Sequence, residues 1–186
     1  MFQINKSEGA IRQKLIFFGL AALIVFIPIG GCIYFTLSFP DFNTGQPHQP
    51  DAWMIANFQK HKSDFERLRQ MILEDKGLNR VDDNWTDPQE PLTIGIKSER
   101  IARYRRIFQQ LGIPRGFSAT AERDKIEFIT TTQGWLAGGS LKSYMYLKTP
   151  PDEVLDDLDK LTFQERPVGT GYRHIEGNWY LYFYGD

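Results

Sequence analysis

The chain has 186 residues, and its 22 basic and 23 acidic side chains give a formal net charge of −1 at pH 7. This balance excludes the strong basic excess of a nucleic-acid-binding protein. Its single cysteine, Cys32, lies in an apolar segment, so we expect neither an internal disulfide nor a thiolate nucleophile in the rest of the chain.

Residues 15–39 form a long stretch without a charged side chain. A helix rises about 1.5 Å per residue, so a helix of this length exceeds the roughly 30 Å of a bilayer's hydrocarbon core. Lys6, Arg12 and Lys14 precede it, against a single acidic residue. The positive-inside rule therefore predicts that residues 1–14 are cytoplasmic and that the C-terminal part is translocated. We expect an uncleaved, single-pass signal-anchor helix.

A lipoprotein acylated at Cys32 is the main alternative, because residues 29–32, IGGC, resemble a bacterial lipobox. Residues 33–39 stay apolar after the cysteine, where a mature lipoprotein turns polar, and this favours the signal-anchor. A buried helix of a soluble domain is a third interpretation, which so long an uncharged run disfavours. The first two interpretations place the same domain on the same side of the membrane.

Residues 40–50 are polar and contain Pro and Gly, which predicts a tether to a single domain over residues 51–186. Apolar side chains recur at helical spacing from Asp51 to Lys76 and again from Ser98 to Leu111. The predicted buried faces are Met54, Phe58, Phe65, Leu68 and Ile72 in the first helix, and Ile101, Tyr104, Ile107, Phe108 and Leu111 in the second.

After Gly116 the periodicity changes from helical to two, which is typical of strands. We predict strands over 126–130, 141–147 and 178–184, a short neighbour over 134–137, and a short helix over 152–161. Two amphipathic helices followed by an antiparallel sheet of three to four strands indicate an α+β fold.

Motifs for catalysis and metal binding are absent from the sequence. The three histidines are scattered without H-E-x-x-H spacing, and neither a phosphate-binding glycine loop nor a G-x-S-x-G elbow occurs. We therefore expect no metal, no cofactor and no enzymatic activity.

The densest polar cluster is the predicted loop over residues 82–87, DDNWTD. It could hold a hard cation through several oxygens, or present Trp85 to a partner. The interpretation we favour is an Asx-rich turn with Trp85 covering the core, because the ligand spacing of a calcium loop is missing.

Charged residues also gather on two segments of opposite sign. Arginines crowd the helix over 98–111, and acidic residues crowd residues 152–159. These segments could face solvent, contact each other or mark a docking patch. A basic helix close to a membrane could also contact anionic head groups, although the periplasmic leaflet favours this only weakly.

The run from Tyr172 to Tyr182 is the most distinctive part of the domain. A strand so rich in Tyr and Trp places aromatic rings on both faces, more than one core face requires, and these residue types are enriched at recognition surfaces. The candidate binding residues are Trp85, Tyr172, Arg173, His174, Trp179 and Tyr180. The structural alternative is a hairpin that turns at residues 176–178, with its aromatic side chains packed on the helices.

Several motifs resemble those of small bacterial envelope proteins that are membrane-anchored or lipoprotein-like. They are Phe65-Glu66-Arg67-Leu68, Val81-Asp82-Asp83 before a Trp-Thr pair, and YRHIE followed by WYLY near the C-terminus, together with the hydrophobic N-terminal segment. The resemblance implies a bacterial inner-membrane protein with a periplasmic domain. It implies no catalytic residue.

These observations predict a binding module that grips an envelope protein or a small envelope ligand through an aromatic sheet. An immunity protein that neutralises an incoming toxin is one concrete form. An enzyme using Asp82, Asp83, Glu176 and His174 is the alternative, and it requires carboxylates held about 5–10 Å apart around a substrate. A structural component of an envelope complex would differ from the binding module only in the permanence of the contact.

Overall fold

The computed structural model describes residues 47–134, 139–162 and 168–186. They belong to a compact unit that spans Asn43–Asp186. The predicted anchor, with Cys32 and the N-terminal residues before it, lies outside the described residues, as do residues 40–46 of the predicted tether. Within the described ranges, no helix has the length and apolar character needed to cross a membrane.

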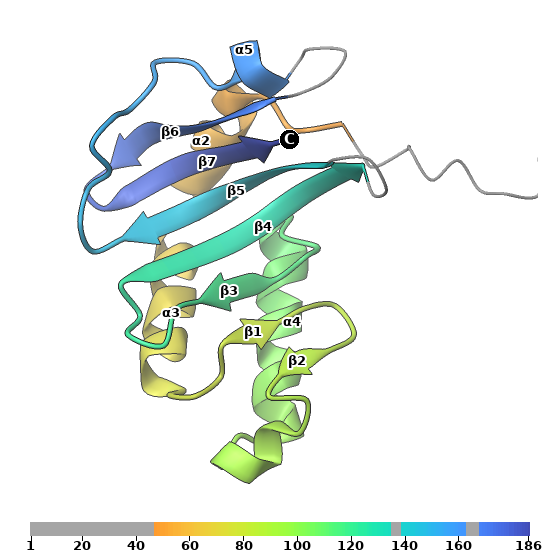
Figure 1. The fold of residues 1–186 in the computed structure, drawn as a ribbon. Helices are drawn as coiled ribbons and strands as arrows, with labels where there is room; N and C mark the ends of the chain where they lie inside the picture. The colour runs from red at the N-terminus through yellow and green to blue at the C-terminus, as the bar shows by residue number, and fades with distance from the viewer. Residues whose placement is uncertain (1–46, 135–138, 163–167) are drawn as a thin grey trace, which may run out of the picture. The chain divides into compact units, whose positions relative to one another are not determined.

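A seven-stranded antiparallel sheet forms one layer of the domain, in the order β2-β1-β3-β4-β5-β7-β6 (Figure 1). Its strands are β1 (Arg80–Val81), β2 (Thr86–Asp87), β3 (Phe117–Ala119), β4 (Lys125–Gly134), β5 (Gly139–Leu147), β6 (Gly169–Glu176) and β7 (Trp179–Gly185).

Helices form the second layer. In Figure 1, α2 (Asp51–Lys60), α3 (Lys62–Glu74) and α4 (Ser98–Leu111) lie behind the sheet and cover one of its faces. The shorter elements are a 3-10 helix, η1 (Pro91–Ile94), and α5 (Asp159–Thr162). The predicted α+β class is confirmed.

The sheet has more strands than the three to four we predicted. Strands β1, β2 and β3 were missed, whereas residues 172–182 form the hairpin turning at residues 176–178 that we gave as the structural alternative. The three missed strands are only two or three residues long, too short to show an alternating pattern. The predicted short strand over 134–137 lies mostly outside the described residues.

Two helix predictions also need correction. The expected helix from Asp51 to Lys76 is broken at His61, whose backbone has φ −116° and ψ 23°. The His61 carbonyl then accepts hydrogen bonds that begin α3. The expected helix over 152–161 is reduced to the four residues of α5.

The core lies between the sheet and the three long helices. Every residue of the two predicted helical stripes is buried, which confirms the periodicity. Aromatic rings interlock at its centre, with Phe65 4.7 Å from Tyr144 and Phe128 stacked 5.7 Å from Trp179, measured between ring centroids. Such pairs add to the hydrophobic stabilisation of the packed area.

Candidate functional site

Aromatic side chains gather on the sheet face that the described helices leave uncovered. Side chains alternate between the two faces of a strand, so Trp179, Leu181 and Phe183 of β7 enter the core while the tyrosines between them point the other way. We call this surface the tyrosine face and define it as Tyr172, His174, Tyr180, Tyr182 and Tyr184.

Cross-strand pairing between β6 and β7 assembles this face. Tyr172 lies opposite Tyr182 with ring centroids 4.9 Å apart, and His174 lies opposite Tyr180 at 5.2 Å. Tyr184 continues the row and is 39% exposed. The rings therefore form a continuous surface along two neighbouring strands.

Buried apolar side chains of neighbouring strands adjoin the tyrosine face on the same side of the sheet. Ile129, Met145 and Tyr180 are buried, yet none belongs to the hydrophobic cluster between sheet and helices. Met145 pairs with Tyr180 across the β5–β7 register. The tyrosine face is thus continuous with apolar side chains of β4 and β5, and its member Tyr180 is itself buried.

Charged groups border this surface. The Lys125 ammonium lies 5.3 Å from the Tyr182 ring centroid, and the Ser143 hydroxyl donates a 2.9 Å hydrogen bond to Glu127 Oε1. Burial, followed by the nearby Tyr172, Glu127 and Tyr184, raises the pKa of Tyr182 to about 12. Its hydroxyl therefore stays neutral and available as a hydrogen-bond donor near neutral pH.

A groove of about 440 Å³ adjoins the tyrosine face at the β6 edge of the sheet. We call it the acidic groove; it is lined by Pro151, Asp152, Glu153, Leu155, Thr170, Gly171 and Tyr172. The Leu155 amide donates a 2.7 Å hydrogen bond to the Tyr172 carbonyl, which holds the two walls together. No described residue forms an ion pair with Asp152 or Glu153, so their charge faces the groove unopposed.

The other candidates from the same run lie on the opposite face of the hairpin. Trp179 is buried in the core, and its indole N–H donates a 2.7 Å hydrogen bond to Glu66 Oε1. Arg173 donates a 2.8 Å hydrogen bond to Asp51. The structure thus brings Tyr172, His174 and Tyr180 together and separates Arg173 and Trp179 from them.

Trp85 lies in the turn between β1 and β2. It is 46% exposed, and the Arg80 guanidinium lies 5.5 Å from its ring centroid, so the expectation that Trp85 covers the core is wrong. Asp82 is fully buried, pairs with Arg80 at 2.6 Å and accepts a 2.8 Å hydrogen bond from the Asp83 amide. Burial alone would raise the pKa of Asp82, but these partners hold it below its usual value.

The residues of the enzyme alternative do not converge. Asp82 follows β1, which four strands separate from β6. Glu176 forms an ion pair with Lys62, and His174 Nε2 lies 2.9 Å from the Gly177 carbonyl. These groups share no cleft among the described residues, so the geometry of a paired acid and base is not assembled.

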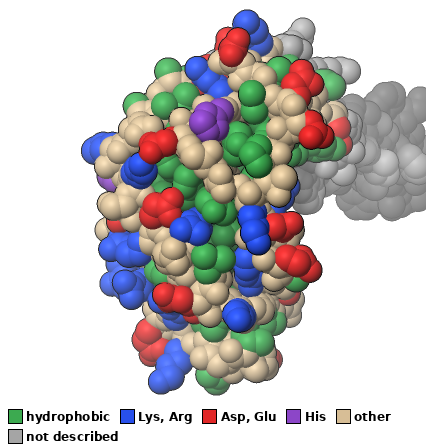
Figure 2. Space-filling model, turned by 90° about the vertical axis from the view of Figure 1, so that its left-hand side faces the viewer, with side chains coloured by type: hydrophobic (Ala, Val, Ile, Leu, Met, Phe, Trp, Pro, Cys, Tyr) green, Lys and Arg blue, Asp and Glu red, His purple; other side chains and the backbone are tan. Residues whose placement is uncertain are grey.

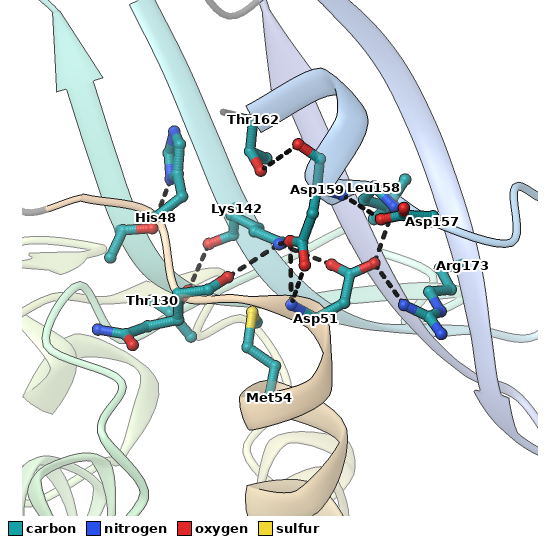
Figure 3. A network of polar contacts seen from close by, with 12 residues as sticks. His48, Asp51, Met54, Thr130, Lys142, Asp157, Leu158, Asp159, Thr162 and Arg173 are labelled. Atoms are coloured by element: carbon teal, nitrogen blue, oxygen red, sulfur yellow. Dashed lines mark hydrogen bonds and ion pairs between the residues drawn. The ribbon is translucent and has the colours of Figure 1, made fainter. Parts of the chain in front are cut away.

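A second polar site is buried between α2, β5 and β6, and sequence analysis missed it (Figure 3). We call it the ionic cluster; it consists of Asp51, Lys142, Asp159 and Arg173. Lys142 is fully buried, with its ammonium 2.6 Å from Asp51 Oδ1 and 2.7 Å from Asp159 Oδ1. Arg173 and the Leu158 amide each lie 2.8 Å from Asp51 Oδ2.

The ionic cluster has the carboxylates of a cation site, but protein donors already occupy them. Asp51, Asp157 and Asp159 place ligand oxygens within 4.8 Å of one another. The Lys142 ammonium forms ion pairs with Asp51 and Asp159, and the Asp159 amide donates a hydrogen bond to Asp157. Burial raises the pKa of Asp51, but hydrogen bonds from Lys142, Arg173 and Leu158 outweigh it and lower that pKa. In this arrangement the Lys142 ammonium takes the place that a cation would occupy between Asp51 and Asp159.

His48, which we placed in the tether, is buried beside this cluster. Its Nδ1 lies 2.6 Å from the Thr131 hydroxyl, and its Nε2 lies 2.8 Å from the Ser140 hydroxyl. Burial, then the charge of Lys142, lowers the pKa of His48 to about 4. Lys142 also donates a 2.8 Å hydrogen bond to the Gln49 carbonyl. Residues 48–51 are thus fixed to the centre of the sheet.

The tyrosine face had a signal in the sequence, whereas the ionic cluster had none. Tyr182 and Tyr184 follow Tyr180 at period two, which by itself places all three on one face. The burial of Lys142 depends on Asp51, far away in the chain, and has no local signal.

Comparison with known proteins found no matching family model, no matching curated protein and no matching solved structure. The resemblance to small envelope proteins stays a prediction.

Proposed function

We propose that this protein is a membrane-anchored binding module of the bacterial envelope, in which the tyrosine face docks a protein partner. The observation that supports this most directly is the second aromatic surface. The core between sheet and helices has its own interlocked rings, so the fold does not need the tyrosines of the uncovered face for that core.

The chemistry of the tyrosine face fits a protein partner. Tyrosine offers apolar area and a hydroxyl at a low cost in side-chain entropy, which is why it is enriched at interfaces. The hairpin holds the rings in cross-strand pairs before a partner arrives, which reduces the ordering cost of association.

The acidic groove adds charge selectivity at one edge. Asp152 and Glu153 favour a partner with Lys or Arg at the matching position, because complementary charge accelerates and orients docking. A basic segment on an incoming toxin would meet this requirement, which makes an immunity protein one concrete form of the proposal.

Photo-crosslinking in cells tests the docking surface. A benzoylphenylalanine at Tyr184 should give a discrete crosslinked product with another protein, whereas the same probe at Lys60, exposed at the end of α2, should not. Adding Tyr182→Ala should reduce the Tyr184 product. Equal products from both positions, or no loss with Tyr182→Ala, would contradict the proposal.

The anchor needs its own experiment. The proposal places residues 15–39 across the inner membrane, with the domain in the periplasm, and the alternative is acylation at Cys32 with the same domain. A reporter fused to the C-terminus should be active in the periplasm, and Cys32→Ala should leave mobility and fatty-acid labelling unchanged. Loss of the fatty-acid label in Cys32→Ala would contradict the signal-anchor helix and show that the protein is anchored by a lipid at Cys32.

A further inference from the structure

The helix layer carries a small hollow lined largely by arginine. It measures about 210 Å³ and is lined by Arg67, Arg103, Arg106, Ile107 and Gln110. Arg67 belongs to α3 and the others to α4, so the hollow lies where the two helices pack together. In the side view of Figure 2, Lys and Arg side chains gather along the left-hand margin, which is the side of the helix layer.

Two of the three guanidinium groups in this hollow have no hydrogen-bond or ion-pair partner among the residues that the structure describes. Arg67 pairs with Asp64 at 2.6 Å, but neither Arg103 nor Arg106 forms a hydrogen bond or an ion pair with any described residue. Glu99 lies one helical turn before Arg103 and likewise forms no ion pair within the described part of the chain. Three positive charges therefore face one bound carboxylate.

The other two arginines of α4 bind acceptors on neighbouring elements. Arg100 binds Asp75 and Glu74, and Arg105 donates a 3.0 Å hydrogen bond to the Asp82 carbonyl. Arg103 and Arg106 line the hollow with the buried Ile107, and neither donates a hydrogen bond to a described residue. Arg67, Arg103 and Arg106 are all exposed, so an anion in the hollow would replace water at their N–H groups and reduce the repulsion between like charges.

Phosphate matches this lining better than a single carboxylate does. The planar guanidinium fork binds oxyanions through paired hydrogen bonds, and a phosphate group offers about −1.5 to −2 charges and three acceptor oxygens. A water molecule takes up about 30 Å³ in the liquid, so the hollow has room for one tetrahedral anion with part of its hydration shell.

We propose that the hollow formed by Arg67, Arg103 and Arg106 is a binding site for a phosphate group. The site lies on the helix layer, away from the tyrosine face, and does not depend on the proposed function. The phosphate can come from solution or from a phospholipid head group near the membrane, since both offer the same oxyanion chemistry.

Binding of inorganic phosphate to the full-length protein in a non-ionic detergent provides the test. Broadening of the phosphate ³¹P resonance would be measured at constant ionic strength for the wild type, Arg103→Gln/Arg106→Gln, and Lys60→Gln/Lys97→Gln. The lysine control removes the same charge from exposed positions outside the hollow, and circular dichroism checks that each variant is folded.

The arginine variant should bind phosphate about tenfold to a hundredfold more weakly, as expected for the loss of charge-assisted hydrogen bonds, and the lysine variant should bind like the wild type. Absence of binding to the wild type, or an equal loss in both variants, would overturn the site. Competition by short-chain phosphatidylglycerol at lower concentrations than glycerol phosphate assigns the site to lipid head groups. Equal competition assigns it to free phosphate.

Discussion

The two faces of strand β7 carry the same kinds of residue in different surroundings. Toward the helices, Trp179, Leu181 and Phe183 are at most 3% exposed and belong to the main hydrophobic cluster. Toward the other side, Tyr180 is buried beside Met145 of β5, whereas Tyr184 is exposed. The first face packs in the main core, whereas none of the described helices covers the second (Figure 1).

Neighbouring residues on β7 give the sharpest test of this contrast. Phe183→Ala should lower the free energy of unfolding by about 4 kcal/mol, since it empties a fully buried ring site. Tyr184→Ala should change it by less than about 1 kcal/mol, because surface substitutions cost little. Urea unfolding followed by circular dichroism measures both. Similar losses in the two variants would erase the distinction between the faces.

The ionic cluster lies on the core side and should be nearly as sensitive. Lys142→Met leaves the carboxylates of Asp51 and Asp159 without their shared cation, and breaking a buried pair costs about 3–5 kcal/mol. We expect the lower end, about 3 kcal/mol, because Arg173 and the Leu158 amide still bind Asp51. Lys148→Met, at an exposed position just beyond β5, is the control and should leave the unfolding midpoint unchanged.

His48 should make the stability of the domain depend on pH. Its pKa is about 4 in the folded protein and 6.5 in the reference state, so the unfolded chain binds the proton more tightly. Stability is therefore full above about pH 6.5 and falls as pH drops toward 4, by at most about 3 kcal/mol at about 1.4 kcal/mol per pKa unit.

Urea unfolding between pH 4.5 and 7.5 measures this loss. His48→Gln removes the titrating ring, so its stability should fall less over this range than that of the wild type. Parallel pH profiles for the two proteins would show that carboxylates elsewhere cause the loss.

The acidic groove should affect association and leave stability almost unchanged. Asp152→Asn/Glu153→Gln should weaken the crosslink from Tyr184 several-fold and make it less sensitive to salt, because exposed charges act mainly on encounter. Glu90→Gln/Glu122→Gln removes two exposed acids away from the groove and should not change the crosslink. An equal decrease would indicate a general effect of net charge.

Sequence periodicity predicted those elements whose buried faces are apolar. Helix α4 has the predicted bounds, Ser98–Leu111, because each buried position holds an apolar or aromatic residue. The hairpin turning at residues 176–178 was predicted, but the start of β6 at Gly169 was not, because the helix side of this strand holds Gly171 and Arg173. A side chain at Gly171 would come within 2.7 Å of Leu155, and Arg173 is neutralised by Asp51. Neither residue signals burial locally.

Like the secondary structure, the tyrosine face was predicted only in part from the sequence. Alternation places Tyr172, His174 and Tyr180 on one face, but only the position of the helices tells which face stays open. His48 and Lys142 are polar residues that fold inward through partners far along the chain. A single sequence carries no record of such pairings.

The fixation of residues 48–51 has a mechanical consequence. His48 is held by β4 and β5, and Lys142 binds both Gln49 and Asp51. A pulling force on the chain before Pro47 would therefore be borne first by the two longest strands, not by helix α2. Such an attachment resists traction until the polar contacts at the middle of the sheet shear apart together.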